Sequence, residues 1–208
     1  MNKSNGFDNY ILHLLTFTVM LRFFKMFMCG LYNVWFYILA AIGIIICLPL
    51  FFLFSFKEEW YPSFYWVARN IWAKLILFGM GLIPKVEFLE NLEKGKNYML
   101  TANHKSMIDI MLMLHISKNP IVFVGKKELV KLPLFGHFYK RVAIMVDREN
   151  AKSRAAVYGH AERRLNQGLS LCIFAEGLVT APDIILAPFK NGVFRFSIHY
   201  QIPIVPMS

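Results

Sequence analysis

Residues 97–109, NYMLTANHKSMID, combine a short apolar run with a polar turn that holds a histidine and an aspartate. The run over 97–102 has the length and composition of a buried strand. We expect a turn after it, and then a helix whose first turn carries Asp109. A strand followed by a helix is the unit from which parallel sheets are built.

Other short runs of β-branched or aromatic residues lie on both sides of this segment. They are VEFLE (86–90), PIVFVG (120–125), RVAIMVD (141–147), LSLCIFAE (169–176) and IPIVP (202–206). Helical patterns separate several of them, most clearly over 153–167, where Ala156, Ala161 and Leu165 lie near one face. This alternation predicts an α/β fold over residues 84–208, with a mostly parallel sheet flanked by helices on both faces.

Residues 1–83 have a different composition and are expected to form an N-terminal membrane-associated helical segment. The stretch 31–56 has no charged residue and exceeds the roughly 20 residues that a helix needs to cross a bilayer core. A secretory signal would have a shorter apolar core and a cleavage site of small residues after it. Pro49 would kink this helix or end it early, so a full crossing and a membrane-dipping hairpin both stay open.

A second aromatic stretch runs over 64–83. Arg69 and Lys74 lie among its tryptophans and phenylalanines, a pattern typical of an interfacial helix whose cations reach toward water. A core helix of the globular domain is the alternative.

The charge balance indicates an anionic partner. Lys and Arg number 23 against 13 Asp and Glu, which gives a formal net charge of +10. The blocks of like charge typical of a nucleic-acid-binding arm are missing, so we expect membrane lipids and no nucleic acid as partners. The three cysteines and six histidines have no metal-ligand spacing, and we predict no metal site and no disulfide framework.

His104 and Asp109 form a candidate dyad. The carboxylate would accept the proton of one ring nitrogen and leave the other nitrogen free as a base that deprotonates an alcohol. Taken alone, the spacing favours a capped helix N-terminus with a hydrogen-bonded histidine over a dyad. The segments that follow along the chain decide between these interpretations.

Those segments occur in a fixed order. After NHKSMID come GKKEL (125–129), LPLFG (132–136), VDR (146–148), FAEG (174–177), FKNG (189–192) and IPIVP (202–206). In this order and at these separations they resemble the four signature blocks of the glycerolipid acyltransferases, the lysophosphatidic acid acyltransferase family. The resemblance extends from Pro84 to the end of the chain, and an apolar N-terminal portion is also usual there.

The resemblance implies a role for each matching residue. His104 would be the general base and Asp109 its orienting partner, with Asn103 beside them in the acceptor site. Lys126 and Arg148 match basic positions that hold the acceptor's phosphate, while Glu176 and Gly177 begin the block that shapes the acceptor site. No side chain becomes acylated and no cofactor is needed, because the acceptor hydroxyl attacks the thioester of acyl-CoA or acyl-acyl carrier protein directly.

The third block departs from the usual pattern of the family. That pattern is Phe-Pro-Glu-Gly-Thr-Arg, whereas residues 174–179 read FAEGLV, so Val179 stands where the Arg is usual. The spacing before Arg148 is also one residue shorter than usual. The chain ends directly after the last block, so either the domain is naturally short at its C-terminus or the sequence is truncated.

The sequence therefore predicts an acyltransferase of phospholipid synthesis at a membrane, with its active site on the cytoplasmic side and lysophosphatidic acid as acceptor. The altered third block keeps other acceptors open, namely a lyso-ornithine lipid, an N-acyl amino acid or glycerol 3-phosphate. A non-catalytic membrane-surface protein of the same fold is the alternative from another functional class.

Overall fold

The computed structural model describes residues 4–147, 149–181 and 183–207, and it contains two compact units, Met1–Ala41 and Ile42–Ser208. Helix α1 (Ser4–Phe54) runs through the first unit and into the second. The predicted boundary at residue 83 was drawn from composition and stays a prediction.

The second unit is built on a five-stranded sheet. Its strands are β1 (Met99–Ala102), β2 (Ile121–Lys126), β3 (Ile144–Val146), β4 (Ser170–Cys172) and β5 (Ile204–Met207). They lie in the order β3-β2-β4-β1-β5, and every pair is parallel. Central residues such as Met99, Ile121 and Leu171 are fully buried, as expected for a sheet that is covered on both faces. The predicted α/β fold is confirmed.

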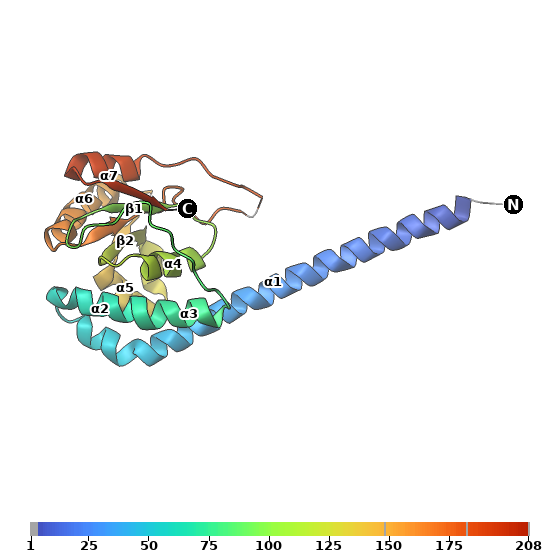
Figure 1. Ribbon diagram of the computed structural model, residues 1–208, viewed down its shortest axis with the longest axis horizontal. Coiled ribbons are helices and arrows are strands. Elements are labelled where there is room, and N and C mark those ends of the chain that lie inside the picture. Colours follow the sequence, from blue (N-terminus) through green and yellow to red (C-terminus); the bar gives the residue numbers. More distant parts are fainter. Residues whose placement is uncertain (1–3, 148, 182, 208) are drawn as a thin grey trace. The chain divides into compact units, whose positions relative to one another are not determined.

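The helices cover the two faces of this sheet. Helices α6 (Ala151–Asn166) and α7 (Gly192–Tyr200) lie on one side, and α4 (Ile108–Ile116) and α5 (Phe135–Val142) lie on the other (Figure 1). Helix α6 begins where Asn150 caps it, because the Asn150 side chain accepts hydrogen bonds from the backbone N–H groups of Lys152 and Ser153. The helix that was predicted over 153–167 is therefore confirmed.

One predicted strand is absent, and another begins later than predicted. Residues 86–90 form no strand. In this described stretch the chain leaves α3 (Ala73–Gly79) and reaches β1 without regular structure, and Leu89 is almost fully exposed. Arg141 and Val142 belong to the last turn of α5, so β3 begins only at Ile144. Basic side chains such as Lys140 and Arg141 suit a helix C-terminus, where the carbonyl dipoles are negative.

Helix α1 continues past Pro49 and ends at Phe54. By length and composition, the stretch His13–Phe54 is a candidate membrane span. The helix does not end at Pro49, although a proline inside a helix lacks one hydrogen-bond donor.

Residues 58–79 form a broken helix that packs on the domain. Its parts are η1 (Glu58–Trp60), α2 (Tyr61–Val67), the π-helical turn η2 (Ala68–Trp72) and α3 (Ala73–Gly79). One face is core: Ile76 and Leu77 are fully buried, and the Tyr61 hydroxyl donates to the carbonyl of Ile121 at 2.7 Å. The opposite face exposes Trp66 and Phe78. One face of this helix is thus part of the core, as the core-helix alternative expected. An interfacial role for the exposed face stays a prediction.

Candidate active site

The turn between β1 and α4 brings His104 and Asp109 together. The Nδ1 atom of His104 lies 3.0 Å from Oδ2 of Asp109. The same oxygen accepts hydrogen bonds from the backbone N–H groups of Lys105 at 2.7 Å and Ser106 at 2.8 Å. An ionised carboxylate only accepts, so the proton belongs on Nδ1 of His104. The Nε2 atom is then the basic nitrogen of the ring.

Asp109 is held in its ionised form. Partial burial alone would raise the pKa of this carboxyl, but the hydrogen bonds from His104, Ser106 and Lys105 more than offset it and lower the pKa below its ordinary value. The local sequence explains the geometry: Asp109 stands in the first turn of α4, and its carboxylate reaches back to the backbone N–H groups of the preceding turn.

The imidazole of His104 also has a fixed plane. Its ring stacks on Phe174, with centroids 4.0 Å apart and an interplanar angle of 12°. Phe174 comes from the segment directly after β4, the strand that neighbours β1 in the sheet. Two adjacent strand ends therefore orient one histidine, which is only 9% exposed.

Glu176 connects this turn to the loop that follows β4. It is 1% exposed, and its two carboxylate oxygens accept hydrogen bonds from different backbone N–H groups, that of His104 at 2.7 Å and that of Ala187 at 2.8 Å. These two hydrogen bonds, with that of Ala187 the stronger influence, lower the pKa of the Glu176 carboxyl. Because both oxygens are engaged with backbone, Glu176 can shape an acceptor site only through the loop that it holds.

Gly177 lies in the left-handed region, with φ of 76°, which favours glycine. The side chain of Lys190 lies over it: a Cβ atom at Gly177 would stand only 3.1 Å from Cδ of Lys190 and 3.2 Å from its Nζ. Glycine at this position therefore allows both the turn and the close approach of a cationic side chain.

The other predicted substrate-binding residues lie at the same edge of the sheet or outside the described residues. Lys126 is exposed at the carboxyl end of β2, and Asn103 is exposed directly after β1. Strands β2 and β1 both pair in parallel with β4, so their carboxyl ends share one edge. Arg148 lies outside the described residues.

Lys105 is a residue that the sequence analysis did not single out. Its Nζ atom is buried, and it has no hydrogen-bond partner within the described parts of the chain. Its charge lies near enough to Glu176 to help lower the pKa of that carboxyl. Its position between His104 and Asp109 in the sequence could have pointed to the site. A lysine in a turn is ordinarily solvated, however, so the sequence did not predict its burial.

The arrangement can perform base catalysis on an alcohol, since an oriented imidazole with a carboxylate behind it is suited to accepting a proton. In the described ranges, no group of three or more His, Cys, Asp or Glu side chains is placed to hold a metal ion.

Known proteins resemble this chain in sequence and in fold. Residues 83–208 match the family described as Acyltransferase. A 1-acyl-sn-glycerol-3-phosphate acyltransferase of Salmonella typhimurium is 31% identical over 196 residues, which cover 90% of this chain and 72% of that protein. Its counterpart in Haemophilus influenzae is 29% identical, over 79% of this chain and 68% of that protein.

The fold also has a solved relative. The crystal structure of the 1-acyl-sn-glycerophosphate (LPA) acyltransferase from Thermotoga maritima superposes with a TM-score of 0.67, covers 85% of this chain and 71% of that one, and is 23% identical. This likeness concerns the fold, and the sequence matches concern the family. From the two together, the chain belongs to the Acyltransferase family and is an O-acyltransferase.

Proposed function

We propose that this enzyme transfers a fatty acyl group from acyl-CoA or acyl-acyl carrier protein to the free hydroxyl of a 1-acyl-sn-glycerol 3-phosphate. The names of the Salmonella and Haemophilus relatives support the acceptor. The observation that carries the mechanism is the 3.0 Å contact between His104 Nδ1 and Asp109 Oδ2, which leaves Nε2 as the base.

The reaction then needs no covalent enzyme intermediate. Nε2 of His104 takes the proton of the acceptor hydroxyl while the hydroxyl oxygen attacks the thioester carbonyl carbon. The tetrahedral intermediate collapses by breaking its carbon–sulfur bond, and the departing thiolate takes the proton back from the imidazolium. Asp109 stabilises the imidazolium between these steps and fixes the tautomer.

A phosphate-bearing acceptor requires cations at the carboxyl edge of the sheet. Lys126 is exposed there, and Lys190 lies against the backbone of the third block. Val179, which is 41% exposed, occupies the usual position of an arginine and cannot bind phosphate. We infer that Lys126, Lys190 and Arg148 share this role, together with the buried ammonium of Lys105.

The membrane placement is part of the same proposal. The candidate span His13–Phe54 would anchor the chain in the bilayer. The active site would lie on the cytoplasmic side, where acyl-CoA and acyl carrier protein are available.

The test is acyl transfer by the full chain, purified in detergent and supplied with radiolabelled acyl-CoA or acyl-acyl carrier protein. The acceptors are lysophosphatidic acid, lyso-ornithine lipid, an N-acyl amino acid and glycerol 3-phosphate. We expect labelled phosphatidic acid from the wild type and none above background from His104→Ala. The second candidate function is acyl transfer to one of the other three acceptors, which Val179 in place of Arg favours. If one of them is acylated and no phosphatidic acid is formed, that compound replaces lysophosphatidic acid as the proposed acceptor.

A further inference from the structure

A cavity of about 310 Å³ lies at the edge of the sheet opposite to the dyad. It is bounded by the end of α1, the start of β3 and the last turns of α5 and α6. Ile144, the first residue of β3, lines it, whereas His104 follows the last residue of β1. Since all strands are parallel, the beginning of one strand and the end of another lie at opposite edges. The cavity is therefore separate from the acyl-transfer site.

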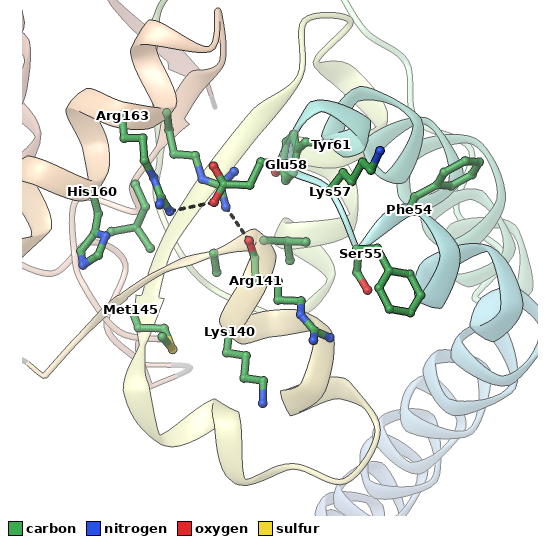
Figure 2. A pocket seen from close by; sticks show the side chains of 15 residues that line it. Phe54, Ser55, Lys57, Glu58, Tyr61, Lys140, Arg141, Met145, His160 and Arg163 are labelled. Carbon is green, nitrogen blue, oxygen red and sulfur yellow. Dashed lines mark hydrogen bonds and ion pairs between the residues drawn. The ribbon is translucent and has the colours of Figure 1, made fainter.

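Cations dominate the lining of this cavity. Five Lys or Arg residues and His160 line it, together with a single carboxylate, that of Glu58. Glu58 is already engaged: one of its oxygens lies 3.0 Å from Arg163 Nη2, and the other accepts from Gln167 Nε2 at 2.7 Å. Figure 2 shows Arg163 directed toward Glu58, while Lys140 and Arg141 point away from that carboxylate. The positive charge of the cavity thus exceeds what its own acid neutralises.

Arg164 forms the rigid floor of the cavity. It is almost fully buried, donates through Nη2 to the carbonyl of Arg141 and through Nη1 to Gln167 at 3.2 Å, and lies over the Tyr61 ring at 5.3 Å. Its guanidinium therefore has a structural role. The cations available to a ligand are Lys57 and Lys140, which are exposed, and Arg141, whose guanidinium donates to the neutral acceptor His137. Within the ranges that the structure describes, none of the three forms an ion pair with a carboxylate.

The same cavity has an apolar wall at the end of α1. Phe54 and Phe56 line it, and Phe56 is 62% exposed. A free inorganic anion would gain nothing from exposed aromatic rings beside the cations, whereas an anion that carries hydrocarbon would bury them. The candidate span His13–Phe54 would also bring the chain to a membrane, where anionic lipids are available.

We propose that this cavity binds the phosphate group of an anionic phospholipid. Lys140 and Arg141 hold the phosphate, and Arg offers a planar pair of donors that fits two of its oxygens. The hydrocarbon next to the headgroup lies against Phe54 and Phe56. Bound there, the lipid is not a reactant, because no part of the dyad lines the cavity.

The test uses the full chain in a zwitterionic detergent, with dioctanoyl phosphatidylglycerol as the probe and native mass spectrometry or tryptophan fluorescence as the readout. Dioctanoyl phosphatidylcholine and inorganic phosphate are the comparison ligands. We expect phosphatidylglycerol to bind and Lys140→Gln/Arg141→Gln to weaken it by about tenfold to a hundredfold, the scale of losing charge-assisted contacts. Lys94→Gln/Lys152→Gln removes the same charge from exposed positions outside the cavity and should leave the affinity unchanged.

Three results would overturn the proposal. If phosphatidylcholine binds as tightly as phosphatidylglycerol, the cavity does not select an anionic headgroup. If the control pair weakens binding as much as Lys140→Gln/Arg141→Gln does, the affinity depends only on the net charge of the protein. Binding of inorganic phosphate as tight as that of the lipid would make the site a free-anion site. If the double variant unfolds, the affinity of Lys140→Gln alone is measured instead, because that side chain is exposed and not part of the core. His104→Ala should bind the probe normally, which separates this proposal from the proposed reaction.

Discussion

The carboxylate of Glu176 accepts a hydrogen bond from the backbone N–H of His104 at 2.7 Å. From the other side, the carbonyl of His104 accepts one from the backbone N–H of Thr180 at 3.0 Å. The backbone of the proposed base is therefore held on both sides by the segment after β4. The third block, in which Val179 is unusual, therefore helps to position the histidine.

Replacing Glu176 with Gln should reduce turnover by about tenfold to a hundredfold, the scale of a small displacement of a reacting group. The amide keeps one acceptor oxygen, but its NH₂ group must face the N–H of either His104 or Ala187. Steady-state kinetics should show a lower kcat with little change in either Michaelis constant. Glu90→Gln, at an exposed position, is the matched control. Unchanged kcat in Glu176→Gln would show that the two hydrogen bonds of Glu176 are not needed for catalysis.

Removing the base should have a larger effect. His104→Ala should lower kcat by at least about a hundredfold, the usual contribution of a general base. Asp109→Asn should also be severe, because an amide can favour the wrong tautomer and must still face the N–H groups of Lys105 and Ser106. Circular dichroism establishes that the variants are folded. Near-normal turnover of folded His104→Ala would end the dyad mechanism.

The parts of the fold and site that could be predicted are those fixed by local sequence. The order of strand, turn and helix around His104 follows from an apolar run, a polar turn and an acidic first helical turn. Residues 86–90 have the composition of a strand, but they pair with no strand of the described sheet. The hydrogen bond between Glu176 and His104 joins residues 72 positions apart, and only the pairing of β1 with β4 creates it.

Lys105 offers a prediction in which stability and function change in opposite directions. Its ammonium nitrogen is buried and without a partner among the described residues, so its desolvation is not compensated. Lys105→Met keeps the length of the side chain and removes the charge. We expect a higher melting temperature together with a raised Michaelis constant for the acceptor and an unchanged one for the acyl donor. A variant that gains stability with unaltered acceptor kinetics would remove Lys105 from the acceptor site.

His115 should make the stability of the fold depend on pH. Burial, and then the nearby charges of Lys74 and Arg69, lower the pKa of this imidazole below its ordinary value of 6.5. A group with a depressed pKa binds fewer protons when folded than when unfolded, so stability falls as the pH drops below about 6.5 toward the folded pKa. Between pH 7.5 and 5.5, thermal unfolding of the wild type should therefore shift downward more than that of His115→Gln. His160→Gln, at an exposed position, should follow the wild type, and identical shifts in all three would contradict the assignment.

Membrane attachment should depend on α1 and should survive both salt and carbonate. Burial of an apolar helix in lipid is insensitive to ionic strength, whereas attraction of basic residues to a lipid surface is screened. A deletion up to Pro84 would be a poor test, because it removes Ile76 and Leu77 from the core of the second unit. A chain that begins at Ile42 follows the boundary between the compact units instead.

We expect the full chain to sediment with membranes after a carbonate wash and the chain from Ile42 to be released by it. Release of the full chain by salt alone would mean that attachment is electrostatic and that α1 is not inserted. If the shorter chain also resists carbonate, the anchor lies within residues 42–83, where Trp66 and Phe78 are exposed on the face opposite to the core. Replacing both with Ser in the shorter chain should then release it, because these aromatic side chains would supply the buried area in the interface.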